Sequence, residues 1–209
     1  MKLCFLAIFL FISLQTIAQN NSTYSFQGAL AINLTNVHDN NTNNALGYGA
    51  AFNLVIPVVQ SGYLKLGTEY NRINLVKHHV SESPVSNSED VSYAFQYLAL
   101  PVSFGVALGK NILPFLEVGG FIDVPVAASR TGTGTTIYPV YVMYEFSGTT
   151  VLPKTNYGPM FTLGVKIPIK EINLIISTTY KNGQMEYYGY RTNVAFDRYF
   201  RLAIGLEWK

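Results

Sequence analysis

Apolar and polar side chains alternate along most of this chain, and the last seventeen residues, 193–209, show the pattern clearly. Apolar residues take nearly every second position, interrupted by Arg198: Val194, Phe196, Phe200, Leu202, Ile204, Leu206 and Trp208. The positions between them hold Ala195, Asp197, Tyr199, Arg201, Ala203, Gly205, Glu207 and Lys209. A period of two predicts a β-strand with one apolar face and one more polar face.

The same alternation recurs in seven earlier segments, so the sequence predicts eight strands. The earlier segments are residues 24–34, 45–56, 63–71, 97–108, 115–124, 157–167 and 172–181. No window after the N-terminal leader has a convincing helical period. Short and long connections alternate strictly, and the long ones are residues 35–44, 78–90, 127–156 and 183–192. This alternation predicts an up-and-down antiparallel sheet with every short turn at one end.

The composition of the two faces decides between a membrane barrel and a soluble lipocalin-like barrel, which is apolar inside. The polar face consists mostly of Gly, Ala, Ser, Thr and Asn, which suit a narrow lumen, whereas a water-facing surface would carry more Lys and Glu. The apolar face carries aromatic residues near strand ends, as expected of girdles at two membrane interfaces: Tyr24, Tyr48, Tyr70, Tyr157 and Trp208. We therefore predict an all-β transmembrane barrel, closed because an open edge in lipid would leave backbone groups unpaired.

Two further segments leave the number of strands open between eight and ten. Residues 135–146 are strand-like and could form a ninth strand, with residues 184–191 as a tenth. The alternative is that residues 135–146 extend a hairpin above the membrane. We favour eight strands, an even number as in bacterial barrels.

The composition and the N-terminus indicate export. Charged residues make up 12% of the chain, against about 25% in soluble domains, and the net charge of +2 gives no basic patch for nucleic acid. Lys2 is followed by an apolar run over residues 3–14, too short for the ~20 residues of a spanning helix. We predict a signal peptide over residues 1–18, cleaved after Ala18, and a barrel domain over residues 19–209. Cys4, the only cysteine, lies in that leader, so no disulfide or thiolate site is expected.

Two short motifs on successive predicted strands carry a resemblance to a known family. The first is Tyr-Leu-x-x-Pro, formed by Tyr97, Leu98 and Pro101, and the second consists of Phe115, Leu116, Glu117 and Gly119. Both motifs resemble those of the PorT-like outer-membrane β-barrel domain family of Bacteroidota. The Glu that the family usually has two residues before the proline is Ala99 here. The resemblance implies a barrel in the outer membrane of a Gram-negative bacterium. A founding member of the family is linked to type IX secretion, but nothing in this chain singles out that role.

Charged residues at lumen positions have both signs and are the first candidate site. They are Lys65, Glu69, Glu117, Asp123, Lys166, Lys181, Asp197, Arg201 and Glu207. Unpaired charge in a narrow barrel is costly, so we expect these residues to pair with one another. Such a network would be a packed plug, and the alternative is a selectivity ring or a proton path.

The long connections hold the other candidates. Residues 79–81 (His-Val-Ser), with Glu82, Glu89 and Asp90 nearby, resemble part of the site of lipid A deacylases, although one polar loop supplies these residue types easily by chance. His78 and His79 are adjacent and would point to opposite faces of a strand, which argues against a metal site. The glycines of residues 130–136 precede no helix and predict no phosphate site. We predict no enzymatic activity and no cofactor.

Four loop aromatics are candidates for contact with a protein partner: Tyr138, Tyr141, Tyr144 and Phe146. Exposed aromatics with polar handles favour interfaces, and the alternative is that these side chains cover the top of the barrel. The sequence therefore predicts a monomeric barrel surrounded by outer-membrane lipid, with a structural or partner-binding role. A small-solute channel is the second hypothesis, and a lipid-modifying enzyme at the outer rim is the third.

Overall fold

The computed structural model describes residues 24–37, 42–81, 87–109, 111–136, 141–189 and 192–208. The predicted signal peptide, residues 1–18, lies outside this part of the chain. No helix among the described residues is long and apolar enough to cross a membrane.

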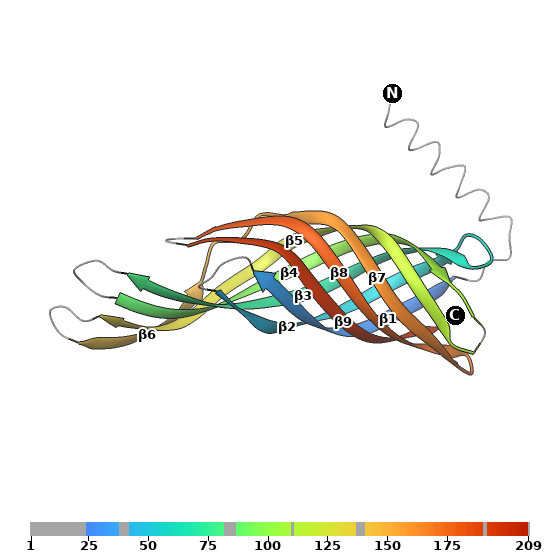
Figure 1. Cartoon of the computed structure of the whole chain (residues 1–209), viewed down its shortest axis with the longest axis horizontal. Helices are drawn as coiled ribbons and strands as arrows, with labels where there is room; N and C mark the ends of the chain where they lie inside the picture. Colours follow the sequence, from blue (N-terminus) through green and yellow to red (C-terminus); the bar gives the residue numbers. More distant parts are fainter. Residues whose placement is uncertain are drawn as a thin grey trace, which may run out of the picture.

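The described residues form nine β-strands, which all belong to one antiparallel sheet (Figure 1). The strands are β1 (Ser25–Val37), β2 (Thr42–Pro57), β3 (Gly62–Ser81), β4 (Asn87–Ala107), β5 (Leu113–Thr136), β6 (Val142–Thr149), β7 (Asn156–Ile169), β8 (Ile172–Gly189) and β9 (Thr192–Trp208). The predicted all-β, up-and-down arrangement is confirmed.

Eight of these strands close into a barrel, as predicted, because β1 pairs with both β2 and β9 and β4 pairs with β5. Paired residues can be followed around the ring from Ser25 through Lys65, Gly119 and Lys181. The row returns to β1 at Thr35, ten positions further along. This stagger sets the tilt of the strands and keeps the interior narrow.

The barrel does not have ten strands, because the ninth strand lies outside the ring. β6 (Val142–Thr149) overlaps the segment 135–146 at residues 142–146 and, among the described strands, pairs only with the far end of β5, at Ser129–Thr136. It therefore extends a hairpin and leaves the ring unchanged. The other segment, 184–191, continues β8 as far as Gly189 instead of forming a tenth strand. The preferred prediction of eight barrel strands and an extended hairpin is confirmed.

The strands differ greatly in length, which makes one side of the barrel much taller. β1 has 13 residues and β7 has 14, whereas β3, β4 and β5 have 20, 21 and 24. Since a membrane-spanning strand needs only about 9–11 residues, these three project beyond the body of the barrel. With β6 they form what we call the extended wall, residues 72–81, 87–96, 127–136 and 142–149, at the left of Figure 1.

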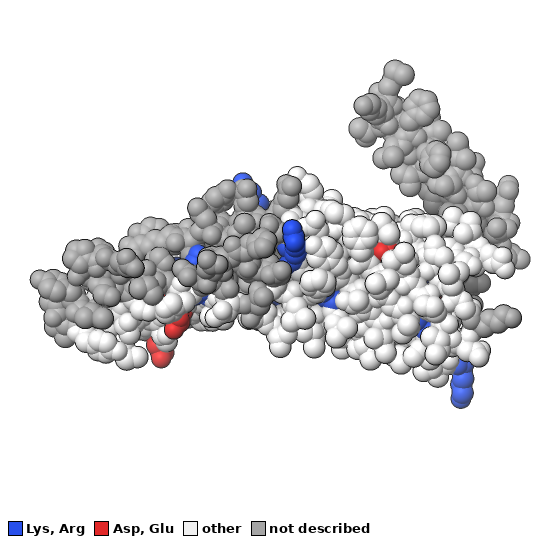
Figure 2. Space-filling model, viewed as in Figure 1, with Lys and Arg blue, Asp and Glu red and all other residues white. Residues whose placement is uncertain are grey.

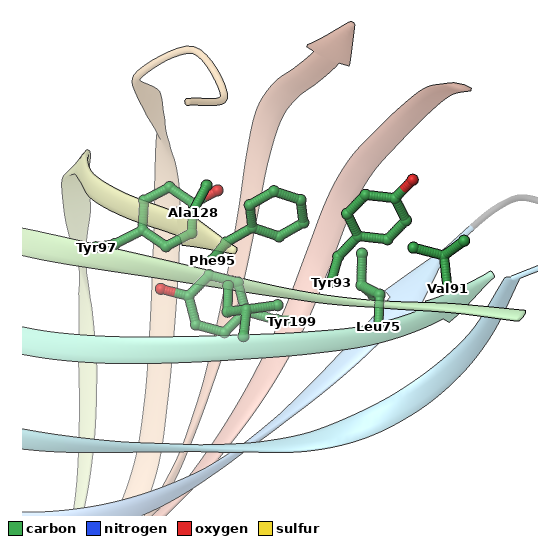
Figure 3. Close-up of a cluster of buried hydrophobic side chains, with 8 residues drawn as sticks. Leu75, Val91, Tyr93, Phe95, Tyr97, Ala128 and Tyr199 are labelled. Carbon is green, nitrogen blue, oxygen red and sulfur yellow. The ribbon is translucent and has the colours of Figure 1, made fainter. Parts of the chain in front are cut away.

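The two faces exchange polarity where the extended wall begins. In the barrel body most outward side chains are apolar, and many inward ones are polar or charged. In the extended wall most inward side chains are apolar, although the buried Lys77 also faces inward. The apolar ones form one cluster with Tyr97 and Tyr199, which lie just outside the wall (Figure 3): Ile73, Leu75, Val91, Tyr93, Phe95 and Ala128. The outward positions there include Arg72, Asn74 and Ser92. This inversion is what a strand requires where its outer surface passes from an apolar medium into water.

Gly119 and Gly120 are neighbours on β5 and test how tightly the ring closes. A Cβ added to Gly119 would lie 2.0 Å from the carbonyl oxygen of Val102 on β4, so the two strands would have to separate. A Cβ on Gly120 would meet nothing nearer than the carbonyl oxygen of Gly158, at 3.4 Å. We expect Gly119→Ala to lower the free energy of unfolding by about 2 kcal/mol or more, and Gly120→Ala to change it by less than about 0.5 kcal/mol. Urea unfolding in lipid vesicles measures both, and equal losses would contradict this packing.

Candidate functional site

The interior of the barrel body contains eight of the nine predicted lumen charges, gathered in two layers. The layer near the short turns, which we call the lower layer, consists of Lys65, Glu117, Lys166 and Glu207. The middle layer consists of Glu69, Asp123, Lys181 and Arg201. The ninth predicted residue, Asp197, has a side chain outside the described part of the chain.

The lower layer holds two ion pairs that join strands across the lumen. Lys65 on β3 pairs with Glu117 on β5, and the Tyr63 hydroxyl donates to Oε1 of the same carboxylate at 2.9 Å. Lys166 Nζ on β7 lies 2.7 Å from Glu207 Oε2 on β9. The same ammonium is 4.4 Å from the centroid of the Tyr63 ring, so a cation–π contact joins the two pairs.

The middle layer is organised around Lys181 of β8, whose side chain is fully buried. Its Nζ atom lies 2.7 Å from Glu69 Oε2 and 3.6 Å from Asp123 Oδ1. Arg201 Nη1 donates to the other oxygen of Glu69 at 2.8 Å, and the Tyr199 hydroxyl donates to Asp123 Oδ2 at 3.0 Å. Four strands, β3, β5, β8 and β9, are thereby connected through the lumen.

Each layer contains two cations and two carboxylates, so the buried charge of each layer is neutral. Neutrality matters because desolvation of an unpaired charge costs several kcal/mol, which only close, well-oriented partners offset. Aromatic rings supply part of the surroundings, since the Lys181 ammonium is 4.8 Å from the centroid of the Phe121 ring. The layers therefore stabilise a closed interior and do not require a bound ion to balance their charge.

The apolar cluster of the extended wall lies directly beyond the middle layer. Tyr199 joins the two, because its ring belongs to the cluster while its hydroxyl binds Asp123. Tyr93 and Phe95 stack with ring centroids 6.0 Å apart. An eight-stranded interior is just wide enough to be filled by side chains, and the ionic layers and this cluster occupy it in succession. We call the three levels together the plug.

The aromatic residues predicted for partner contact differ in their surroundings: Tyr144 and Phe146 are packed, whereas Tyr141 is exposed. Tyr144 and Phe146 on β6 lie over Gly134 and Gly132, the glycines opposite them on β5. The Tyr144 hydroxyl donates to Glu89 Oε1 at 2.6 Å, and Phe146 packs against the apolar cluster. These two rings lie over the inner face of the extended wall, where the glycines make room for them. Tyr141 is 62% exposed, and Tyr138 lies outside the described residues.

The residues considered for catalysis do not form a described constellation. The Nδ1 atom of His78 contacts Oδ1 of Asp90 on the outer face of the extended wall. His79 occupies the next position of β3 and pairs in register with Glu89, whose carboxylate accepts from Tyr144. The side chains of Ser81 and Glu82 lie outside the described residues. Within the described part, no group of three or more His, Cys, Asp or Glu residues could hold a metal ion.

The sequence analysis missed a polar face on the outside of the extended wall. Two adjoining hollows of 690 and 280 Å³ lie there and share Ser92 and Thr131. The larger one is also lined by Asp90, Thr133, Glu145 and Ser147, and the smaller one by Arg72, Asn74 and Ser129. The signal was present as Ser129, Thr131 and Thr133 at alternate positions of β5, but the polarity inversion had to be known before those positions could be placed outside.

No family model matches this chain, and no curated protein matches it. Among solved structures it is similar to Neisserial surface protein A, with 11% identity, a TM-score of 0.48, and coverage of 91% of this chain and 99% of that one. OprG of Pseudomonas aeruginosa is 9% identical, with a TM-score of 0.46 and coverage of 88% and 94%. Ail of Yersinia pestis is 9% identical, with a TM-score of 0.43 and coverage of 88% and 96%. Likenesses at this level assign no function.

Removal of Lys181 tests the middle layer. We expect Lys181→Met to lower the free energy of unfolding by about 3–5 kcal/mol, because Glu69 and Asp123 would then share Arg201 as their only cation in this layer. Adding Asp123→Asn restores neutrality and should recover part of the loss. Lys170→Met, in the exposed turn between β7 and β8, serves as the control. Urea unfolding in vesicles measures all three, and a Lys181→Met protein as stable as the control would show that the ion pairs are dispensable.

Proposed function

We propose that this protein is an outer-membrane β-barrel of a Gram-negative bacterium whose closed barrel anchors the extended wall at the cell surface, where the wall binds a partner. The observation that carries the proposal is the inversion of polarity along β3, β4 and β5. A lipid-facing belt, a plugged lumen and a water-facing wall follow one another along the same strands.

The belt supports a membrane location. Outward side chains around the barrel body are apolar and exposed, among them Leu30 at 68%, Leu163 at 58%, Ile32, Leu100, Phe161 and Ile204. On the face seen in Figure 2, Lys, Arg, Asp and Glu are sparse over the barrel body. Soluble monomers rarely expose contiguous apolar patches above a few hundred Å², whereas a barrel in lipid requires such a belt. Aromatic residues lie near its two borders, with Tyr48 and Tyr157 at one and Tyr24 and Trp208 at the other.

The lengths of the connections support the orientation. The short connections follow β2, β4 and β7, at the end of the barrel where the chain finishes (Figure 1). The extended wall lies at the opposite end. Outer-membrane barrels have short periplasmic turns and longer extracellular segments, so this proposal places the wall outside the cell. Export through a signal peptide cleaved after Ala18 belongs to the same proposal.

The plug favours an anchoring role over the alternatives. A small-solute channel needs a continuous water path, and here Glu117 and Lys166 are buried and paired within the lower layer. The motif that resembles a lipid-modifying enzyme, residues 79–81, has its side chains outside the described part of the chain, so it adds no support for catalysis. We therefore propose a non-enzymatic protein.

A PorT-like relationship remains part of this proposal and rests on the motif residues. Two of them are integral to the interior, since Tyr97 belongs to the apolar cluster and Glu117 pairs with Lys65. Their role here is to pack and balance the lumen. The motifs therefore support a barrel of this type and leave the choice of partner to the wall.

Conductance tests the closed lumen. We expect the mature chain, residues 19–209, to produce no discrete openings in a planar bilayer in concentrated potassium chloride, because side chains fill the interior. Folding is verified by heat-dependent gel mobility before the recording. Reproducible openings of one amplitude, from protein shown to be folded, would favour the channel.

Cysteine labelling tests the location and orientation. Since the only native cysteine is in the predicted leader, Thr133→Cys on β5 and Ser61→Cys in the β2–β3 turn each introduce one thiol into the mature chain. We expect a membrane-impermeant maleimide to label Thr133→Cys on intact cells and Ser61→Cys only after lysis. The reverse pattern would overturn the orientation, and equal labelling of both variants on intact cells would overturn the membrane location.

A further inference from the structure

The outer face of the extended wall is an ordered array of small polar side chains. Four strands contribute to three cross-strand rows, which follow from the register. The rows are Asn74–Ala94–Ser129–Thr149, Val76–Ser92–Thr131–Ser147 and His78–Asp90–Thr133–Glu145. Half of the twelve members are Ser or Thr, so the array presents donors and acceptors at the regular spacing of a β-sheet. We call it the hydroxyl face.

The hydroxyl face is hollowed instead of flat. The 690 Å³ hollow lies over β4, β5 and β6, and the 280 Å³ hollow continues it toward the barrel body over β3, β4 and β5. Ser92 and Thr131 line both hollows, so the two form one groove. Sites for small polar ligands combine such concavity with a few convergent hydrogen-bonding groups.

The charge of the groove changes along its length. Asp90 and Glu145 line the 690 Å³ hollow, which is the one farther from the barrel body. His78 contacts Asp90. The 280 Å³ hollow, which is nearer the barrel body, is lined by Arg72. Arg72 pairs in register with Tyr48, so it lies at the aromatic border of the belt. A ligand that fits this groove therefore has an anionic group near the membrane and neutral hydroxyl groups beyond it.

Arg72 is held in place while it retains donors for a ligand. Its Nε atom donates to Asn74 Oδ1 at 3.1 Å, and Asn74 in turn donates to the carbonyl oxygen of Leu46 at 2.7 Å. The guanidinium lies 5.6 Å from the centroid of the Tyr48 ring, and Nη1 donates to the Tyr48 hydroxyl at 3.4 Å. Among the described contacts these engage two of the five guanidinium donors. A planar guanidinium positioned in this way suits a phosphate oxygen pair.

We propose that the hydroxyl face binds the phosphorylated saccharide headgroup of the glycolipid that surrounds the barrel in the outer leaflet. Arg72 takes a phosphate at the border of the belt, and Ser92, Thr131 and Thr133 bond sugar hydroxyls further along the groove. The glycolipid is chosen as the ligand because the groove adjoins the lipid-facing belt. The groove begins where the belt ends and runs in the direction in which the headgroup extends. This inference rests on the proposed outer-membrane location and supplies the chemistry of the partner.

Calorimetry with a water-soluble probe separates the hydroxyl face from the belt. The mature protein in phospholipid nanodiscs is titrated with fully deacylated lipopolysaccharide, which has the phosphorylated saccharide but no acyl chains. We expect saturable binding, weakened about tenfold in the Thr131→Val/Thr133→Val double variant, which keeps the side-chain shapes and removes two hydroxyls. Thr178→Val, an exposed threonine on β8 within the belt, is the matched control and should bind like the wild type.

Arg72→Gln and a dephosphorylated probe separate the two ends of the groove. We expect Arg72→Gln to weaken binding of the phosphorylated saccharide about tenfold. The Arg72→Gln protein should then bind the phosphorylated and the dephosphorylated saccharide equally, because the lost contact is the one to phosphate. Heat-dependent gel mobility confirms that every variant is folded.

The outcomes distinguish this inference from the proposed function. If the Thr133→Cys variant is labelled from outside and the wild type is electrically silent, yet the wild type fails to bind the saccharide, the inference is wrong and the anchoring role stands. The inference is also wrong if the Thr131→Val/Thr133→Val double variant and Thr178→Val bind the saccharide with equal affinity, whether or not that affinity is below that of the wild type. A change from monomer to dimer that depends on Thr131 and Thr133 would assign the face to a second copy instead. Labelling of Ser61→Cys on intact cells, with Thr133→Cys labelled only after lysis, would overturn both proposals.

Discussion

Backbone hydrogen bonding around a closed ring is the constraint on which the rest of this molecule depends. An eight-stranded sheet in lipid can leave no edge unpaired, so its last strand must pair with its first. Here the paired residues return to β1 displaced by ten positions, from Ser25 to Thr35. That closure leaves a lumen only wide enough for side chains. Close approaches such as that of Gly119 to the Val102 carbonyl are a direct consequence, and every charge that faces inward must find its partner within the ring.

The buried charges meet this condition by forming neutral layers. Each layer pairs residues from non-adjacent strands, whose side chains meet in the lumen because the ring is closed, as Lys181 of β8 and Glu69 of β3 illustrate. Tyrosines extend the network, since Tyr63 donates to Glu117 and Tyr199 donates to Asp123. The interior is therefore held by directional contacts as well as by packing, which suits a barrel that serves as a rigid anchor.

The extended wall follows from the same strands under a different solvent. Beyond the belt the outer surface can be polar, so the apolar residues of β3, β4 and β5 turn inward and cover the ionic layers. Tyr144 and Phe146, which the sequence suggested for partner contact, are used in that cover. Their inward packing leaves Ser, Thr and Asn residues on the outer face of the wall. The binding surface that we propose is thus a by-product of where the membrane ends.

The alternation of side chains determined the strands, their two faces and the residues that line the lumen, because a period of two is a local property of the chain. It could also indicate that lumen charges must pair, since desolvation makes unpaired charges costly. It could not say which pairs form: Arg201 and Glu69 are 132 residues apart, and only ring closure brings them to 2.8 Å. Nor could it place the hydroxyl face, because the same alternating pattern reverses its meaning at the membrane border. Only the tertiary structure fixes that border, through the stagger of the strands and the unequal heights to which they rise.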